Sequence, residues 1–150
     1  MTTLYADADA CPVKDETVKV ADRHKLTVFF VSNAYMRLPA GYDVRRQIVN
    51  DGFDAADDWI AKAAGPGDIV ITSDIPLADR CLKAGAAVLG PAGKPFTPDG
   101  IGMALAMREL SRDLREMGEI SGGGPAFSKK DRSQFLQALE EAVRAAVRQA

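Results

Sequence analysis

Residues 68–76 read DIVITSDIP and carry the clearest strand signal in this chain. The β-branched run at 69–71 is typical of a strand that is buried on both faces of a parallel sheet. Ser73 and Asp74 end this strand, and Pro76 suits the first turn of a helix that we expect to close at Gly85. A strand that passes at once into a helix is the unit from which parallel sheets are built.

The neighbouring segments repeat this alternation of strand and helix. We expect strands at 4–6, 26–31, 42–49 and 86–89, and helices at 12–25 and 54–64. The segment 42–49 mixes apolar residues with Arg45 and Arg46, which is typical of a short edge strand. Because parallel neighbours need crossover helices, this order predicts an α/β doubly wound fold, in which a mostly parallel five-stranded sheet lies between two helical layers.

Two more helices are expected towards the C-terminus. A Gly- and Pro-rich loop over 90–100 precedes a helix at 101–117, whose apolar positions 103, 106, 107, 110, 114 and 117 suit packing on the sheet. A glycine-rich hinge at 118–127 leads to an amphipathic helix at 128–150, with Phe135, Leu139 and Val143 on its apolar face. We therefore expect one domain over residues 1–150, with the α/β core in 1–117.

The composition excludes several classes of protein. With 150 residues, 47% of them hydrophobic, and a net charge of −2, the chain is an ordinary globular domain without a global cationic field. His24 is the single histidine, and we expect it to be inert; Cys11 and Cys81 are the only cysteines. This excludes four-cysteine zinc sites and nucleases that need paired histidines. Without a leader or a long apolar run, we expect a cytoplasmic protein with free thiols and no membrane partner.

Acidic side chains gather where the predicted strands end. The first strand leads to Asp7 and Asp9, the second to Asn33, and the strand at 68–72 to Thr72, Ser73 and Asp74. The carboxyl ends of parallel strands lie at one edge of the sheet, so these groups should meet there. No Gly-rich phosphate loop follows any strand, and the crevice is therefore predicted to be acidic.

Clustered carboxylates repel one another, by roughly 3 kcal/mol for a pair about 5 Å apart, and so take up protons or recruit a cation. Mg²⁺ or Mn²⁺ prefers carboxylate and water oxygens. Such an ion suits metal-assisted phosphodiester hydrolysis, which needs no histidine base.

Each acid also has a purely structural interpretation. Asp9 is equally suited to capping the next helix, Asp57 completes a capping box with Asp54, and Asp74 is expected to cap its own helix while remaining ionised. Asp58 is expected to pair with Lys62, and Asp79 is either a supporting acid or simply exposed. The side chains expected to contact a phosphate-bearing substrate are Asn33, Arg37, Ser73, Lys129 and Arg132, with Arg45, Arg46 and Lys130 as further basic candidates.

Four motifs together resemble a known family. They are DADACP at 7–12, GFD-x-AD at 52–57, GDIVIT-x-DIPLA at 67–78, and the late GGP at 123–125 with Asp131-Arg132. They look like the bacterial YaiI/YqxD-like family, over nearly the whole chain. Its members are regarded as relatives of the PIN nuclease domains, and the Thr-Ser-Asp-x-x-Leu pattern at 72–77 is similar to the corresponding PIN motif.

The resemblance implies a PIN-like fold with sheet order 3-2-1-4-5 and a metal site. Carried over onto this chain, the catalytic and metal-binding residues are Asp7, Asp57 and Asp74, with Asp9 and Asp79 as additional metal ligands. Many PIN nucleases place a further acid after the fifth strand, whereas this chain has Gly-Pro-Ala-Gly-Lys at 90–94 and Asp99 further on.

Three functions follow as hypotheses. The first is an Mg²⁺- or Mn²⁺-dependent nuclease acting on RNA or single-stranded nucleic acid. The second is a DxD-type phosphatase, in which Asp7 is the nucleophile and Asp9 the acid/base. The third is a non-catalytic module that binds nucleic acid or protein and forms a homodimer through its last helix.

Overall fold

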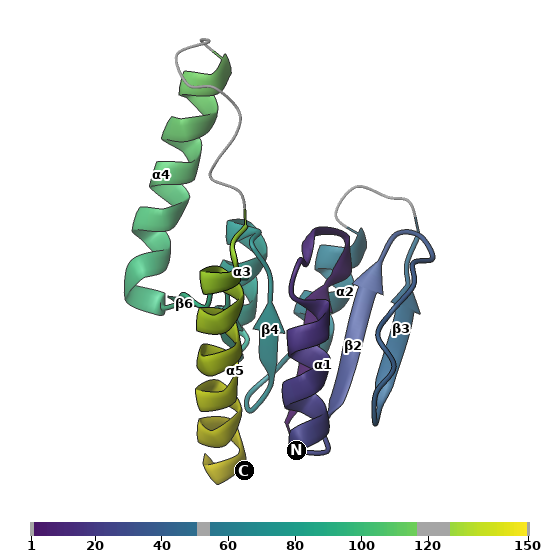
Figure 1. Ribbon diagram of the computed structural model, residues 1–150. Coiled ribbons are helices and arrows are strands. Elements are labelled where there is room, and N and C mark those ends of the chain that lie inside the picture. Colours follow the sequence, from purple (N-terminus) through teal and green to yellow (C-terminus); the bar gives the residue numbers. More distant parts are fainter. Residues whose placement is uncertain (1, 51–54, 117–126, 150) are drawn as a thin grey trace.

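The protein forms a single six-stranded sheet flanked by helices (Figure 1). The computed structural model describes residues 2–50, 55–116 and 127–149. The strands are β1 (Thr3–Asp7), β2 (Thr27–Ser32), β3 (Val44–Ile48), β4 (Ile69–Ile71), β5 (Ala87–Leu89) and β6 (Pro95–Phe96). The helices are α1 (Lys14–Arg23), α2 (Ala55–Ala63), α3 (Ile75–Lys83), α4 (Pro98–Glu116) and α5 (Lys129–Gln149), and a 3-10 turn, η1, spans Ala8–Ala10.

The sheet order confirms the expected topology. The strands run β3-β2-β1-β4-β5-β6, and every pair from β3 to β5 is parallel. The two central strands, β1 and β4, pair in register from Leu4 opposite Ile69 to Ala6 opposite Ile71. Because all five strands point the same way, their carboxyl ends form one edge of the sheet, which lies at the top in Figure 1.

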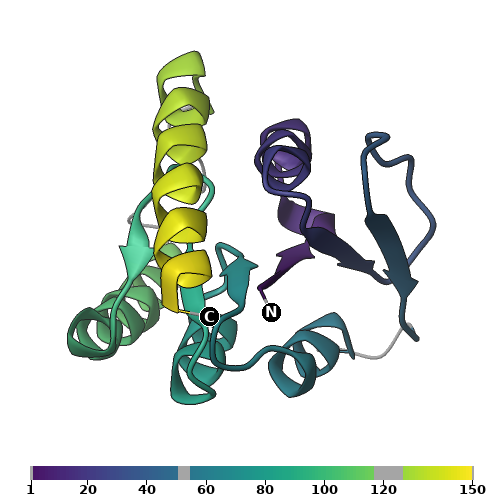
Figure 2. The same cartoon turned by 90° about the horizontal axis from the view of Figure 1, so that it is seen from below.

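Helices cover both faces of the sheet, as the view along the strands in Figure 2 shows. Successive strand residues point to opposite faces, so Leu4 and Ala6 join one core and Tyr5 joins the other. The first core lies beneath α1 and α5 and includes Phe135 and Leu139, whose side chains have no exposed surface. The second core lies beneath α2 and α3 and takes in Ile101 from α4.

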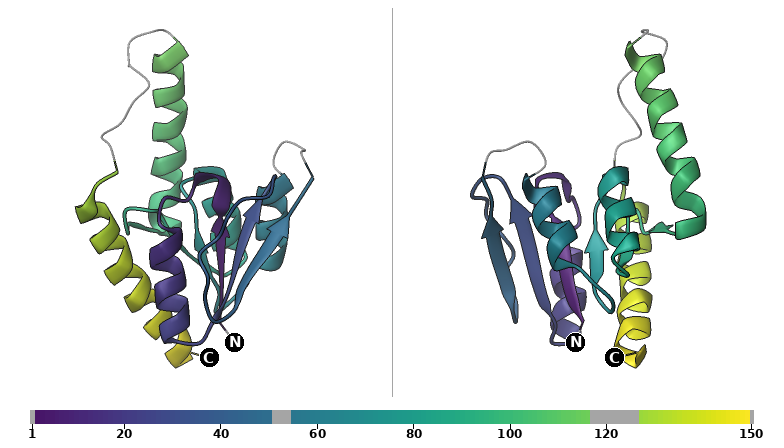
Figure 3. Two further views of the ribbon diagram at one scale, coloured as in Figure 1. Left: turned by 45° about the vertical axis from the view of Figure 1, so that its right-hand side comes forward. Right: turned by 180° about the vertical axis from the view of Figure 1, so that it is seen from behind.

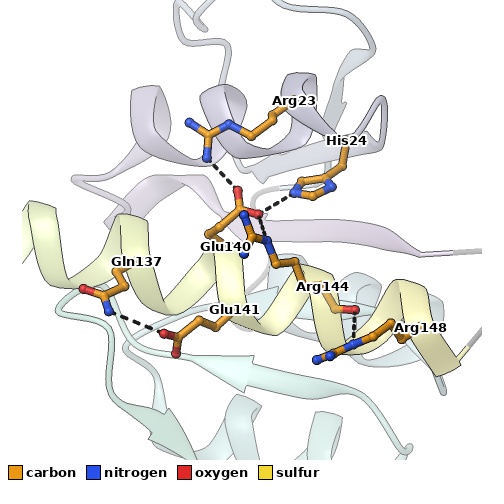
Figure 4. Close-up of polar contacts among 7 residues, drawn as sticks. All are labelled: Arg23, His24, Gln137, Glu140, Glu141, Arg144 and Arg148. Carbon is orange, nitrogen blue, oxygen red and sulfur yellow. Dashed lines mark hydrogen bonds and ion pairs between the residues drawn. The ribbon is translucent and has the colours of Figure 1, made fainter.

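Helix α5 packs beside α1, and a polar cluster closes the contact between them (Figure 4). The carboxylate of Glu140 accepts hydrogen bonds from Arg23 Nη1, His24 Nε2 and Arg144 Nε, each at 2.7 Å. Burial raises the pKa of Glu140, but the hydrogen bonds from His24, Arg23 and Arg144 outweigh burial and lower this pKa to about 2. His24 was expected to be inert, yet it binds a helix that follows it by more than a hundred residues.

Three expectations about the C-terminal part need correction. The segment expected to be a loop over 90–100 contains β6, which pairs antiparallel with β5. Helix α4 begins at Pro98 instead of residue 101. On its expected inner face, the side chains of Met103 and Met107 do not pack on the sheet and are 69% and 52% exposed. The α4 helix instead contacts α3 and extends past the carboxyl edge of the sheet (Figure 3).

Some expectations fall outside the described residues. These are the cap at Asp54, the end of a helix at residue 117 and the hinge over 118–126. In the parts of the chain that the structure describes, no helix combines the length and the apolar character needed to span a membrane.

Candidate functional site

The candidate site lies at the carboxyl edge of the sheet, where β1 and β4 end side by side. Asp7 is the last residue of β1, and Asp9 follows within η1. Asp74 follows β4 and caps α3, because its Oδ1 accepts a hydrogen bond of 2.9 Å from the backbone N–H of Leu77. Both roles proposed for Asp74 from the sequence, helix cap and member of the acid cluster, are thus compatible with one conformation.

Thr72 joins the two central acids. Its buried hydroxyl lies 3.5 Å from Asp7 Oδ2, to which it donates, and it accepts the backbone N–H of Asp74 at 3.0 Å. The backbone N–H of Thr72 is itself bound to the carbonyl of Leu89 on β5 at 3.1 Å. The end of β4 is therefore held on both sides, which fixes Asp7 relative to Asp74.

Asp7 carries the electrostatic signature of this cluster. Burial raises the pKa of its carboxyl, and the negative charges of Asp9 and Asp74 raise it further, while the hydrogen bond from Thr72 opposes them. A half-buried carboxylate beside two other carboxylates holds its charge at a cost, which a proton or a cation would relieve.

The second strand contributes to the same edge through Asn33. The backbone N–H of this exposed residue donates to Asp9 Oδ2 at 3.1 Å. The carboxylate of Asp9 thus turns towards the end of β2, and in the described structure no side-chain hydrogen bond caps α1. Of the predicted ligands, Asp9 and Asp74 lie near enough to Asp7 for their charges to raise its pKa.

The other two predicted ligands lie on the helices behind the sheet. Asp57 on α2 is half-buried near α3, where it adds to the effect of burial in raising the pKa of the Cys81 thiol to about 11. Asp79 on α3 is bound to Lys83 one turn later, at 2.9 Å. Asp58 pairs with Arg80 of α3 at 2.8 Å, which corrects the expected pair with Lys62.

Basic side chains lie on the β2 side of the acids. A pocket of about 380 Å³, here called the Arg37 pocket, is lined by Cys11, Lys14, Asp15, Arg37 and Leu38 together with two prolines. Arg37 is exposed, and the ammonium group of Lys14 donates to the carbonyl of Cys11 at 2.7 Å. Burial raises the pKa of the Cys11 thiol, so this group stays protonated and lines the pocket as a neutral side chain.

The basic residues of α5 are occupied differently. Arg132 Nη1 donates to the carbonyl of Pro12 at 2.7 Å and lies 3.5 Å from Glu16, and its guanidinium stacks on the ring of Phe127. This side chain therefore fastens the start of α5 to the start of α1. Lys129 is exposed at the first turn of α5.

An apolar pocket lies on the opposite side of the acids, next to Ser73. It has a volume of about 390 Å³, and its walls come from the β4–α3 turn, the β5–β6 segment and α4. Its main lining residues are Ser73, Ile75, Pro91, Pro95, Phe96 and Ala104. We call it the Phe96 pocket.

Sequence reasoning missed two residues of this edge as site residues. Thr72 was placed in the crevice without a role, although its position between a strand end and Asp74 predicts that it contacts both. Lys14 lies in the first turn of α1, where a positive charge opposes the helix dipole. That unfavourable placement was the available signal. In the described ranges 2–50, 55–116 and 127–149, no group of three or more His, Cys, Asp or Glu side chains is arranged to hold a metal ion.

Comparison with known proteins identifies the family. A family model described as "Uncharacterized BCR, YaiI/YqxD family" matches residues 5–145. The chain is 65% identical to a UPF0178 protein of Parvibaculum lavamentivorans over 97% of its own length and 95% of that protein. It is 60% identical to one from Rhodospirillum rubrum over 97% of each chain, and 59% identical to one from a Caulobacter species over 95% of each. No solved structure matches. The chain belongs to the YaiI/YqxD family of bacterial proteins.

Proposed function

We propose that this protein is a divalent-metal-dependent nuclease that hydrolyses phosphodiester bonds of RNA or single-stranded nucleic acid. The observation that carries the proposal is that Asp7, Asp9 and Asp74 lie near enough at one edge of the sheet for the charges of Asp9 and Asp74, together with burial, to raise the pKa of Asp7. Because the described residues hold no three such side chains arranged to bind a metal ion, the proposal requires these carboxylates to move closer together when the ion binds. This donor set consists of oxygen atoms only, which fits Mg²⁺ or Mn²⁺. The sheet order 3-2-1-4-5 is also the order that the PIN resemblance implies, which is support by analogy of fold alone.

The acidic residues and Thr72 have separate roles in this proposal. Asp7 and Asp74 are the proposed catalytic ligands that share the edge of the sheet with Asp9. Asp57, the third proposed catalytic ligand, and Asp79, an additional acid, lie on α2 and α3, so their roles rest on the family resemblance alone. Such an ion, when bound, polarises the phosphoryl oxygen and lowers the pKa of an attacking water. The Thr72 hydroxyl orients Asp7, and the hydrogen bond from the Leu77 N–H fixes the carboxylate of Asp74 at the start of α3.

Substrate contacts are proposed on both sides of the acids. Arg37 lines the Arg37 pocket on the β2 side, beyond Asn33. There its guanidinium would contact a neighbouring phosphate of the substrate backbone. Ser73 borders Asp74 on the other side. Lys129 is exposed and available for the same purpose, whereas Arg132 already binds Pro12 and Glu16, which makes it the weakest of the proposed substrate contacts.

The test is cleavage of a labelled single-stranded RNA and of the matching DNA in the presence of Mg²⁺ or Mn²⁺. The triple variant Asp7→Asn, Asp57→Asn, Asp74→Asn should lose cleavage, and Asp74→Asn alone should lose about 100-fold or more. Asn is as good a helix cap as Asp, so the α3 helix should survive the single change. The matched control is Asp58→Asn, which removes the same charge from an exposed position paired with Arg80 and should cleave like the parent.

Other outcomes would favour the remaining hypotheses. Equal cleavage by the parent and the triple variant would assign the activity to a contaminant. Millimolar Mg²⁺ or Mn²⁺ should raise the melting temperature of the parent; if neither does, the protein is a binding module and not a metal nuclease. A large stabilisation by beryllium fluoride that Asp7→Asn abolishes would indicate the phosphatase, with Asp7 as the nucleophile.

A further inference from the structure

The Phe96 pocket has a position and a shape that the proposed cleavage of a phosphodiester does not by itself require. Ser73 lines the pocket and is the immediate neighbour of Asp74, so their Cα atoms lie about 3.8 Å apart. The pocket therefore opens next to the acid cluster, on the side away from the Arg37 pocket. Its volume of about 390 Å³ falls in the range of small-molecule sites.

The walls of the pocket are fixed by the surrounding backbone. The turn after β5 is closed by hydrogen bonds from Gly90 N–H to the Lys94 carbonyl at 2.9 Å and from Gly93 N–H to the Gly90 carbonyl at 3.0 Å. On the α4 side, Thr97 Oγ1 accepts the N–H of Gly100 at 3.0 Å and so fixes the first turn of the helix. A pocket built in this way exists before any ligand arrives, which lowers the entropic cost of binding.

The lining suits a flat apolar ligand with a negative charge attached. The Phe96 ring is half-buried and the rings of Pro91 and Pro95 form rigid apolar walls, while Lys94 is an exposed cation among the lining residues. Aromatic side chains bind single-stranded nucleic acids by stacking on the bases, and Lys contacts the phosphates. A base in this pocket would remain linked to a phosphate at Asp74 through its own sugar.

We propose that the Phe96 pocket binds one unstacked nucleobase of the substrate, beside the phosphodiester bond to be cleaved. This proposal rests on the proposed nuclease function and specifies its substrate class. In a duplex the bases are paired and stacked, so inserting one carries an unpairing penalty that a single strand avoids. The pocket thus selects for single-stranded substrates.

The test measures binding separately from cleavage. The scaffold is the full chain carrying Asp7→Asn, Asp57→Asn and Asp74→Asn. Its acid cluster, in which only Asp9 remains a carboxylate, should not cleave and should repel phosphate less than that of the parent. Its affinity is measured by fluorescence anisotropy for a labelled single-stranded RNA and for a strand of equal length with abasic positions. The intact strand should bind about tenfold more tightly, which is the effect of one stacked base.

Two variants of α4 locate the effect. Ala104→Trp on this scaffold fills the pocket and should reduce the affinity for the intact strand to that for the abasic strand. Met103→Trp adds the same side chain at a position that is 69% exposed and should leave both affinities unchanged. Phe96→Leu, which keeps apolar bulk without an aromatic face, should weaken only the intact strand. Melting curves check that each variant is folded.

The outcomes separate the two proposals. Equal affinity for intact and abasic strands, no measurable binding of either, or equal behaviour of Ala104→Trp and Met103→Trp would overturn the base pocket. If the parent nevertheless cleaves RNA with a divalent ion, the nuclease proposal stands without it. If the pocket binds a base but the parent never cleaves, the site belongs to a binding module.

Discussion

At the scale of single residues, the ionised side chain of Asp7 lies in surroundings that disfavour its negative charge. Burial and two neighbouring carboxylates raise the pKa of its side chain, and the Thr72 hydroxyl is the one contact that lowers it. A group whose folded pKa is above its ordinary value of 3.8 opposes folding once the pH has risen through that folded pKa. Stability given up in this way is typical of functional positions.

We predict that Asp7→Asn stabilises the protein at neutral pH when divalent ions are absent. The gain in the free energy of unfolding should be about 0.5–2 kcal/mol and should vanish as the pH falls below the ordinary pKa of the carboxyl, where Asp7 is protonated in both states. Urea unfolding at a series of pH values in EDTA measures it.

The same substitution should cancel most of the stabilisation that Mg²⁺ or Mn²⁺ gives to the parent. Asp58→Asn serves as the control, because an exposed ion pair contributes little to stability. A variant at position 7 that is less stable than the parent at neutral pH would contradict the view that repulsion dominates at Asp7.

The predictability of these residues follows from where their partners lie. Asp7, Asp9 and Asp74 could be placed together from the sequence, because the ends of adjacent parallel strands must meet at one edge. The partner of Asp58 could not be predicted from the sequence, since the choice between Lys62 and Arg80 depends on how α2 packs on α3. His24 was misjudged for the same reason: its partner Glu140 is brought close only by the folding of α5 onto α1.

At the scale of elements, β6 shows how tertiary structure overrides local signals. Pro95 lacks a backbone N–H, and a two-residue strand containing proline reads as a loop. The strand exists because β5 presents an open edge to it, and the turn before it is held by α5. Pairing with β5 therefore makes a strand of this segment, although its own composition does not favour one.

We predict that Gly93→Ala destabilises the protein. Gly93 has a φ angle of +89°, and a Cβ atom there would lie 2.7 Å from the backbone carbonyl oxygen of Gln134 in α5. Strained backbone together with a clash against a helix should reduce the free energy of unfolding by about 2–4 kcal/mol, measured by thermal or urea unfolding.

Gly102→Ala provides the matched control for that measurement. Gly102 lies within α4, where an added Cβ has no neighbour within 4 Å, so alanine should be neutral or stabilise by up to about 1 kcal/mol. An unchanged melting temperature for Gly93→Ala would show that the turn and α5 are not in the contact described.

At the scale of the whole molecule, α5 is part of the domain and not an appendage. Phe135, Leu139 and Val143 of α5 have no exposed side-chain surface, so the apolar face expected to form a homodimer is buried within the chain itself. The polar cluster around Glu140 seals this contact from outside. Helices α1 and α5, which lie far apart in the sequence, therefore stabilise each other's position in the fold.

We predict that Glu140→Gln loosens this contact and reduces the free energy of unfolding by about 1–3 kcal/mol at neutral pH, because three charge-assisted hydrogen bonds are weakened. The folded pKa of Glu140 is about 2 and its ordinary value is 4.5. Its contribution is therefore complete above the ordinary value and is lost as the pH falls from about 4.5 to about 2.

Chemical denaturation of parent and variant across this pH range tests the assignment. The difference in stability between them should shrink with acidification and nearly disappear at the lowest pH. Glu141→Gln is the neighbouring control, since Glu141 is exposed and its described contact is with Gln137 on the same helix. A difference that stays constant with pH would show that the Glu140 charge does not hold α5 in place.

The two margins of the sheet differ from its interior in a way that bears on behaviour in concentrated solution. An open strand margin is a template on which a second molecule can add a strand, the first step towards aggregation. Here one margin is β6, too short and too rich in proline to serve, and the other is β3, which carries the exposed charges of Arg45 and Arg46. Both edge strands therefore disfavour pairing with a strand of a second molecule. The backbone hydrogen bonds of the sheet are accordingly expected to form within one molecule.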